Sequence, residues 1–237
     1  MEKIFIVMPA YNEEDNIFDT LNSWYPIIER YSANGESRLV VINDGSKDST
    51  YKRMLEYAEN HPLFVPLSKE NSGHGPTVIA AYDYAINNGA DYIFQTDSDG
   101  QTNPEEFDVF WNERNKYDGI FGRRIVRGDG KSRAFVEKVV CFLLKLYFGV
   151  DIPDANAPFR LMKADTLKKY LYRLMPDYNI PNIMITTYFV YYSERIKFIP
   201  ITFKPREKGI NSINIRKIIK IGWNATKSFS ELKKDMK

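Results

Sequence analysis

The chain has 237 residues, of which 43% are hydrophobic, 27% charged and 14% aromatic, and this length and composition support one packed domain. Its 33 basic and 31 acidic residues leave a net charge of +2, so the overall charge does not favour nucleic acid as a partner. One cysteine excludes an internal disulfide, and two histidines leave little material for a histidine-based metal cluster. The N-terminal apolar run is too short for a signal peptide and no run is long enough to span a bilayer, which predicts a soluble cytoplasmic protein.

Short apolar runs alternate with helical patterns in the first half of the chain. The runs predict strands at 3–8, 37–43, 63–68, 91–97 and 117–122, and the patterns between them predict helices at 13–31, 48–60, 76–89 and 104–116. Pro66 within the third run indicates an edge strand or a bulge. Strands that alternate with helices of about 10–15 residues are typical of βαβ units and a mostly parallel sheet.

The pattern changes after Gly122. A basic loop at 123–133 precedes predicted helices at 132–148, 166–174 and 181–193 and a strand at 195–204, and no element is assigned to FRLMKAD at 159–165. We expect one domain at 1–212, with a nucleotide-binding half at 1–122 and an acceptor-facing half at 123–212.

Polar, aromatic and glycine-rich groups follow four of the predicted strands. The segments are PAYNEE (9–14), NDGS (43–46), NSGHG (71–75) and DSDGQ (97–101). The carboxyl ends of parallel strands meet at one edge of the sheet, where such folds bind their ligands. The four segments together therefore predict a ligand site at that edge.

Two carboxylates mark the end of the fourth run. Asp97 and Asp99 flank Ser98, and residues two apart in an extended chain point to the same side. Carboxylates aimed together repel unless a cation lies between them, and hard oxygen ligands suit Mg²⁺ or Mn²⁺. Gln101 adds a neutral carbonyl oxygen. The alternative is a solvated turn rich in aspartate and glycine.

Other nucleotide motifs are absent. No G-x-G-x-x-G follows a predicted strand, which argues against a dinucleotide-dependent dehydrogenase. Residues 130–132 read Gly-Lys-Ser, but Ile125 stands where a P-loop requires its first glycine.

The segments PAYNEEDNI, VINDGSKDST, NSGHGPTVIAAYDYA, DYIFQTDSDGQTNPEE and APFRLMKA resemble, in this order, motifs of the inverting family 2 glycosyltransferases, over about 3–212. The most similar group is the dolichyl-phosphate or polyprenyl-phosphate sugar transferases. The resemblance implies the GT-A fold, an α/β fold with a mostly parallel central sheet flanked by helices. It also implies a nucleotide-sugar donor and a Mg²⁺ or Mn²⁺ ion, held by Asp97, Asp99 and Gln101, that neutralises the leaving diphosphate.

The resemblance also implies which residues contact the donor. They are Pro9, Ala10, Tyr11, Glu13, Asp44, Gly73, Asp97, Ser98 and Arg124. Tyr11 is expected to stack on the base and Glu13 to hold a ribose hydroxyl. Asp44 matches the second of the family's paired acids, which contacts the base, whereas Asn43 replaces the first.

Three residues are implied to act in the reaction: Asp99, Asp154 and Arg206. Asp154 and Arg160 are expected to shape the acceptor side, although the segment between them departs from the family's Asp-x-Thr-Ser-Gly-Phe-Arg at three positions. Arg206 is expected to clamp a diphosphate or an acceptor phosphate.

The acceptor can be argued from a missing carboxylate. In family members that act on sugar hydroxyls, a Glu-Asp pair after the Phe-Arg motif supplies the general base. The corresponding stretch here, 178–187, contains no acid. Either Asp177 or Asp154 serves as base, or the acceptor is a phosphate monoester, which is already largely dianionic at neutral pH. The second interpretation predicts a polyprenyl phosphate, positioned by Arg124, Arg127, Lys131 and Arg206.

The last 25 residues form a different surface. Residues 213–237 carry seven basic and two acidic side chains, with apolar residues spaced as in an amphipathic helix. They predict contact with an anionic membrane at its inner face, and a helix packed on the domain is the alternative.

Other functions stay open at this point. The acceptor could be a saccharide or lipid-linked sugar hydroxyl. The chain could be a non-catalytic nucleotide-sugar-binding subunit, against which its intact metal residues argue. A nucleotidyltransferase would need an early glycine-rich loop with Lys or Arg, which PAYNEE lacks.

Overall fold

The computed structural model describes residues 2–32, 35–127, 131–205, 229 and 233. Its strands are β1 (Ile4–Ala10), β2 (Arg38–Asp44), β3 (Phe64–Lys69), β4 (Tyr92–Thr96), β5 (Gly119–Arg127), β6 (Phe159–Lys163) and β7 (Ile196–Phe203). Its helices are α1 (Ile17–Tyr31), α2 (Thr50–Ala58), α3 (His74–Asn87), the 3-10 turn η2 (Pro104–Glu106), α4 (Phe107–Glu113), α5 (Lys131–Phe148), α6 (Ala164–Leu171) and α7 (Pro181–Tyr191).

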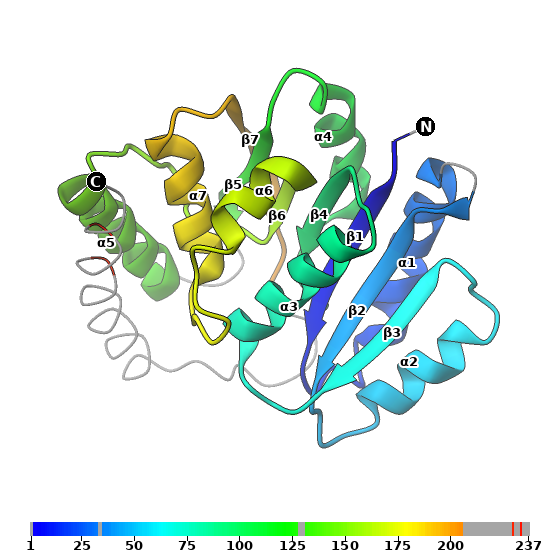
Figure 1. The fold of residues 1–237 in the computed structure, drawn as a ribbon. Helices are drawn as coiled ribbons and strands as arrows, with labels where there is room; N and C mark the ends of the chain where they lie inside the picture. Colours follow the sequence, from blue (N-terminus) through cyan, green and yellow to red (C-terminus); the bar gives the residue numbers. More distant parts are fainter. Residues whose placement is uncertain (1, 33–34, 128–130, 206–228, 230–232, 234–237) are drawn as a thin grey trace.

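The strands form one sheet in the order β3-β2-β1-β4-β6-β5-β7 (Figure 1). β1 pairs in parallel with β2 and β4, and β2 pairs in parallel with β3. β6 is antiparallel to both of its neighbours, β4 and β5, and β7 runs parallel to β5. The predicted mostly parallel sheet is therefore confirmed, and so is the edge position of the strand that contains Pro66.

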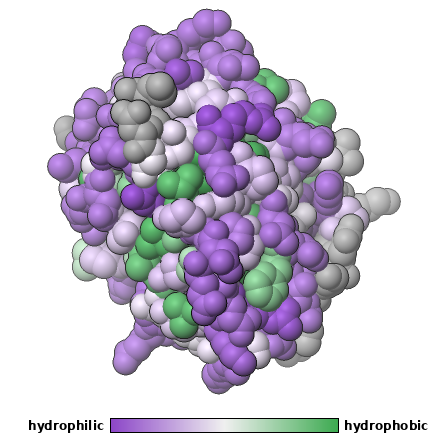
Figure 2. Space-filling model, turned by 90° about the vertical axis from the view of Figure 1, so that its right-hand side faces the viewer, coloured by the Kyte–Doolittle hydropathy of each residue, from purple (hydrophilic) through white to green (hydrophobic). Residues whose placement is uncertain are grey.

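Helices cover both faces of this sheet. Side chains alternate between faces along a strand. Phe5 and Val7 thus join the core under α3, α5, α6 and α7, whereas Ile4 and Ile6 join the core under α1, α2 and α4. Because both faces are covered, the parallel strands read as continuous apolar runs in the sequence. The flank that carries α1 and α2 is mostly hydrophilic, with hydrophobic side chains in small separate spots (Figure 2).

Two parts of the second half differ from the sequence-based expectation. FRLMK, to which no element was assigned, forms β6 and inserts between β4 and β5. β5 continues to Arg127, so the start of the predicted basic loop is a strand that pairs with β7, with an irregularity between Arg124 and Val126.

The ends of the elements also shift. α1 begins at Ile17 and not near residue 13, because 11–16 form a turn in which the Glu13 carbonyl accepts hydrogen bonds from the backbone N–H groups of Asn16 and Ile17. The predicted helix at 213–237 lies outside the described residues except for Phe229 and Lys233; Phe229 is buried, 5.6 Å from Phe148 between ring centroids. No helix in the described ranges is long and apolar enough to cross a bilayer.

We expect Phe94→Ala to destabilise the fold strongly. Phe94 is fully buried on β4, and its ring centroid lies 4.7 Å from that of Phe159 and 4.9 Å from that of Phe107. Removing the ring leaves a cavity, so the free energy of unfolding in urea should fall by ~3–5 kcal/mol. Val109→Ala, at a position that is 52% exposed, serves as the control and should change it by less than ~0.5 kcal/mol. Equal effects of the two substitutions would contradict this packing.

Candidate functional site

The loops after β1 and β2 are bound to each other at the carboxyl edge of the sheet. The backbone N–H of Asn12 donates to Ser46 Oγ at 2.9 Å, and the backbone N–H of Lys47 donates to Asn12 Oδ1 at 2.9 Å. Asn12 has φ 54°, a left-handed conformation that asparagine tolerates. Tyr11 precedes it and is 41% exposed, so its ring is accessible to a ligand.

Glu13, which is expected to hold a ribose hydroxyl, is buried in this structure. The residue is 7% exposed, and its Oε2 accepts a hydrogen bond from Asn16 Nδ2 at 2.7 Å. Its backbone N–H donates to Thr50 Oγ1 at 2.8 Å. In this structure Glu13 ties the start of α1 to the start of α2, and its contact with a ribose stays a prediction.

Asp44 organises the loop that precedes α3. Its carboxylate accepts hydrogen bonds from the backbone N–H groups of Ser72 and Gly73 at 2.9 and 2.8 Å, and from Lys69 Nζ. Burial alone would raise the pKa of Asp44, but these hydrogen bonds outweigh it and hold the pKa below its usual value. Gly73 has φ 97°, which a residue with a side chain rarely adopts.

The loop after β4 joins the two halves of the sheet. Ser98 Oγ donates to the Pro9 carbonyl of β1 at 2.8 Å. Gln101 Nε2 donates to the Lys204 carbonyl at 2.8 Å, and the Lys204 N–H donates back to the Gln101 carbonyl at 2.8 Å. Lys204 and Pro205 are the last residues described before Arg206, which itself lies outside the described residues.

The two carboxylates that are predicted to bind a metal lie beside the hydrogen bonds of Ser98 and Gln101 and are partly exposed to solvent. The Asp97 side chain is 23% exposed, and its Oδ1 lies 3.3 Å from Nε2 of His74. Asp99 Oδ1 accepts the backbone N–H of Gln101 at 3.2 Å. Desolvation alone would lower the pKa of His74. The hydrogen bond and charge of Asp97, with smaller contributions from Asp99 and Asp44, outweigh it and raise this pKa. The raised pKa reflects the concentration of negative charge at this edge of the sheet.

These residues fit a divalent cation that is shared with a ligand. No three Asp, Glu, His or Cys side chains in the described ranges converge as a complete protein metal site. A pair of aspartates and one amide oxygen suits a Mg²⁺ or Mn²⁺ ion that takes its other ligands from phosphate and water. Asp97, Asp99 and Gln101 could hold such an ion.

Asp154 and Arg124 form a buried ion pair on the other half of the sheet. Arg124 Nε and Nη2 donate to Oδ2 and Oδ1 of Asp154, both at 2.8 Å, and the side chains are 6% and 3% exposed. Arg124 Nη2 also lies 3.4 Å from Glu137 Oε2. Both oxygens of Asp154 are thus engaged by one guanidinium, and Arg124 is not displayed as an open fork for a phosphate.

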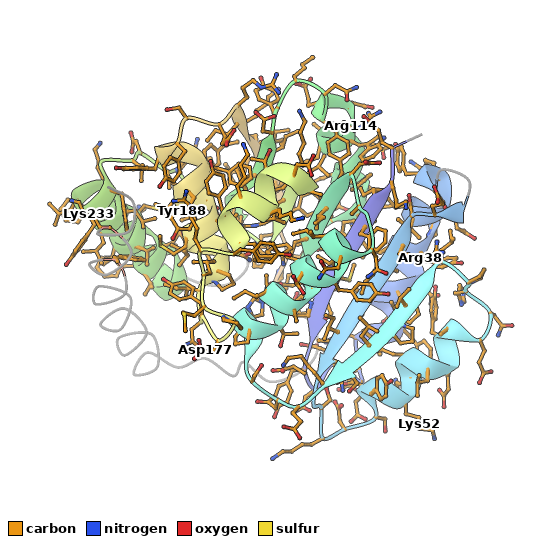
Figure 3. All side chains as sticks on the ribbon, viewed as in Figure 1. Arg38, Lys52, Arg114, Asp177, Tyr188 and Lys233 are labelled. Atoms are coloured by element: carbon orange, nitrogen blue, oxygen red, sulfur yellow. The ribbon has the colours of Figure 1, made fainter. Side chains whose placement is uncertain are left out.

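The other acids and cations predicted to act in the second half of the chain are more scattered. Asp177 is exposed on the loop between α6 and α7, beside the start of α3 (Figure 3). Arg123 is exposed on β5, whereas the side chains of Arg127 and Lys131 lie outside the described set.

Three side chains that support the site could not be recognised as such in the sequence: Lys69, Gln95 and Asn182. Lys69 Nζ donates to Asp44, Asn182 Nδ2 donates to Gln95, and Gln95 Nε2 donates to Asp97. Only Gln95 carries a visible signal, because it is a polar residue inside the apolar run DYIFQTD.

Comparison with known sequences gives one family and many relatives. The sequence model described as Glycosyl transferase family 2 matches residues 5–171. A dolichyl-phosphate β-glucosyltransferase of Trichomonas vaginalis is 30% identical over 181 residues, covering 70% of this chain and 54% of that protein. An undecaprenyl-phosphate mannosyltransferase of Micrococcus luteus is 25% identical over 215 residues, covering 87% and 86%. This chain spans about half the length of several of its relatives.

Solved structures share the fold at low identity. Glucosyl-3-phosphoglycerate synthase from Mycobacterium tuberculosis, in complex with Mn²⁺, UDP-glucose and glycerol 3-phosphate, matches with a TM-score of 0.63 at 16% identity, covering 92% of this chain and 75% of that one. TarS of S. aureus in complex with UDP-GlcNAc matches with a TM-score of 0.60 at 17% identity, covering 92% and 65%.

We expect Asp44→Asn to reduce stability in a pH-dependent way. Because the folded pKa of Asp44 is lowered, its contribution is complete above the unfolded value of ~3.9 and is lost as the pH falls through the folded pKa. The free energy of unfolding at pH 7 should therefore drop by ~1–3 kcal/mol in the variant. Urea titrations at a series of pH values should show the gap to wild type narrowing below about pH 4. Asp151→Asn, where the side chain is 88% exposed, is the control, and a gap for Asp44→Asn that did not change with pH would contradict the assignment.

Proposed function

The chain belongs to glycosyltransferase family 2 and has its α/β GT-A fold, and we propose that it is an inverting, metal-dependent enzyme that transfers one sugar from a nucleotide-sugar donor to a polyprenyl phosphate. The observation that carries the proposal is the convergence of the loops after β1, β2, β3 and β4 around Asp97 and Asp99. Relatives named as dolichyl-phosphate and undecaprenyl-phosphate sugar transferases support the choice of acceptor.

On the donor side, the loops supply a surface for a nucleoside diphosphate. The exposed ring of Tyr11 is suited to stack on the base, and the loop held by Asp44 brings backbone close to the nucleotide at Gly73. Asp97, Asp99 and Gln101 would hold a Mg²⁺ or Mn²⁺ ion, which, when bound, neutralises charge on the leaving diphosphate. The Lys204 contact with Gln101 holds the end of β7 at this loop, and Arg206, which lies outside the described residues, is proposed to contact a phosphate.

On the acceptor side, the positions of the acids favour a nucleophile that needs no general base. Asp154 is occupied by Arg124, and Asp177 is exposed on a surface loop. A phosphate monoester is largely dianionic at neutral pH. One of its oxygens can attack the anomeric carbon, forming a C–O bond as the bond from that carbon to the nucleoside diphosphate breaks and the diphosphate leaves with the electron pair.

A surface on α5 supports an acceptor that resides in a membrane. Phe135, Phe142 and Leu146 are 66%, 64% and 67% exposed, and Val139 between them is 41% exposed. Their spacing places them along one side of the helix. The exposed Lys138 and Lys145 lie on the same helix, and such a combination suits an anionic bilayer surface. We propose that the basic side chains of 213–237 also contact the membrane, at its inner face, whereas Phe229 of this segment packs against Phe148 and does not face lipid.

The test of this function is an acceptor competition with radiolabelled nucleotide sugars and Mn²⁺. We expect label in polyprenyl phosphate, and not in soluble saccharides or lipid-linked sugars, together with release of nucleoside diphosphate. Asp99→Ala should abolish transfer while circular dichroism and thermal unfolding stay as in wild type, because Asp99 is partly exposed and its main role is to bind the metal. Asp151→Asn serves as the matched acidic control.

Three outcomes would contradict the proposal. Wild-type turnover by Asp99→Ala would remove the metal assignment. Label only in hydroxyl acceptors, lost in Asp177→Asn or Asp154→Asn, would restore a general base. Donor binding without turnover would indicate a non-catalytic subunit.

The α5 surface gives a separate prediction. The triple variant Phe135→Ser, Phe142→Ser, Leu146→Ser should lose transfer to long-chain polyprenyl phosphate in phosphatidylglycerol vesicles by roughly tenfold or more, because it removes apolar area that enters the interface. Transfer to a short-chain, water-soluble prenyl phosphate should stay unchanged. The control is Leu55→Ser with Val109→Ser, at exposed positions of α2 and α4. An equal loss with both acceptors would show that α5 does not act through the membrane.

A further inference from the structure

A chain of buried side-chain hydrogen bonds leads from α3 and α7 to Asp97. Tyr82 OH donates to Asn182 Oδ1 at 2.9 Å, Asn182 Nδ2 donates to Gln95 Oε1 at 3.1 Å, and Gln95 Nε2 donates to Asp97 Oδ1 at 3.2 Å. Tyr82 and Gln95 are fully buried, and Asn182 is 2% exposed. These residues come from α3, α7 and β4, and the chain ends on a carboxylate that is open to ligands.

The groups at the two ends of this hydrogen-bond network determine which group donates and which accepts in each bond. A carboxylate at Asp97 can only accept, so Gln95 must present its NH₂ group to it and its carbonyl oxygen to Asn182. Asn182 must then present its own NH₂ group to Gln95 and its oxygen to Tyr82. Burial raises the pKa of Tyr82, which keeps the phenol protonated as the donor at the far end. A single orientation of the two amide groups therefore allows all three hydrogen bonds to form.

The position of α7 is itself held from two sides. Arg160 Nη1 donates to the Asn182 carbonyl at 3.0 Å. On the other side, a Cβ on Gly75 of α3 would lie 2.4 Å from the Asn179 carbonyl oxygen, so only glycine lets the loop before α7 approach this closely. The Asn182 side chain is thus held beside Gln95 by the Arg160 side chain and by the close approach of the loop before α7 to Gly75.

A structural role alone does not account for this chain. Burying three polar side chains, Tyr82, Gln95 and Asn182, between the sheet and its helices costs desolvation that apolar side chains of the same size would avoid. The contact with Gln95 engages Oδ1 of Asp97, and Oδ2 makes no hydrogen bond to any residue in the described ranges. The arrangement therefore orients the carboxylate so that one oxygen is held by protein and the other is presented to a ligand.

We propose that Gln95 and Asn182 are positioning residues for Asp97, which hold its carboxylate in the orientation that binds a divalent cation and so couple the placement of α7 to metal affinity. This inference rests on the proposed metal site. Residues behind a metal ligand commonly change metal affinity when they are substituted, by about 10–100-fold.

The test is a double-mutant cycle with Gln95→Met and Asn182→Leu, which replace each amide by an apolar side chain of similar size. Binding of Mn²⁺ alone is followed by the electron paramagnetic resonance signal of the free ion. Gln95→Met should weaken Mn²⁺ binding by roughly tenfold or more. Asn182→Leu should weaken it by less, because Tyr82 OH lies 3.5 Å from Gln95 Oε1 and can partly replace the lost donor.

The coupling between the effects of the two substitutions on Mn²⁺ affinity distinguishes a positioning role of Asn182 from a packing role. If Asn182 acts through Gln95, the double variant binds Mn²⁺ no more weakly than Gln95→Met alone. In the transfer assay, the Mn²⁺ concentration for half-maximal rate should rise in both single variants, while the rate at saturating Mn²⁺ changes little. The control is Thr187→Val, which removes a fully buried hydroxyl of α7 that donates to Ile183 and has no contact with Gln95.

Three results would overturn the inference, and Asp97→Ala distinguishes the first two. If Asp97→Ala abolishes Mn²⁺ binding but Gln95→Met changes it less than twofold, the metal site stands and the positioning role is wrong. If Asp97→Ala leaves Mn²⁺ binding unchanged, the proposed metal site and the inference fail together. Additive losses in the double variant, or an equal loss in Thr187→Val, would indicate general destabilisation of α7.

Discussion

A buried guanidinium that contacts no carboxylate within the described residues holds the second half of the fold together. Arg160 is 1% exposed on β6, and its nitrogens make five hydrogen bonds, to the carbonyls of Ala155, Ala157 and Asn182 and to Thr186 Oγ1. Burial lowers the pKa of this arginine, but an arginine stays charged at neutral pH, so these four neutral oxygens must replace the water that the guanidinium has lost. The segment before β6 and the start of α7 are therefore fixed to the sheet by the same side chain.

Two side-chain contacts of the candidate site depend on this arrangement, that of Asp154 with Arg124 and that of Asn182 with Gln95. β6 runs antiparallel, so its amino end lies at the edge where the parallel strands have their carboxyl ends, and the chain before it brings Asp154 to Arg124 at that edge. On the other side of Arg160, the fixed start of α7 places Asn182 behind Gln95. The loops of the first half do not depend on Arg160, because they bind one another directly through Asn12, Ser46 and Asp44.

The sequence was sufficient to locate the strands and helices of the first half and insufficient for those of the second half, for a physical reason. The parallel strands are apolar runs followed by polar loops, so both their location and their functional edge can be inferred from local pattern. β6 is five residues long with an arginine at its second position, and only its pairing with β4 and β5 makes it a strand. Arg124 was interpreted as a phosphate ligand because the position of Asp154 thirty residues later is set by β6, which local pattern did not reveal.

The same non-local contacts bear on how the proposed reaction would proceed. A general base at the start of α7 would be a second carboxylate on the side of the sheet that Gln95 and Asp97 share, and like charges in a buried setting oppose ionisation of both. Asn182 is neutral, and its amide donates to Gln95, which in turn donates to the carboxylate of Asp97 that would bind the metal. With Asn182 in this network, the start of α7 carries no acid that could serve as a general base, which agrees with the proposed acceptor, a phosphate that is already ionised. Under the proposed function, the missing acid at 178–187 and the buried amide of Asn182 would both follow from the use of such a nucleophile.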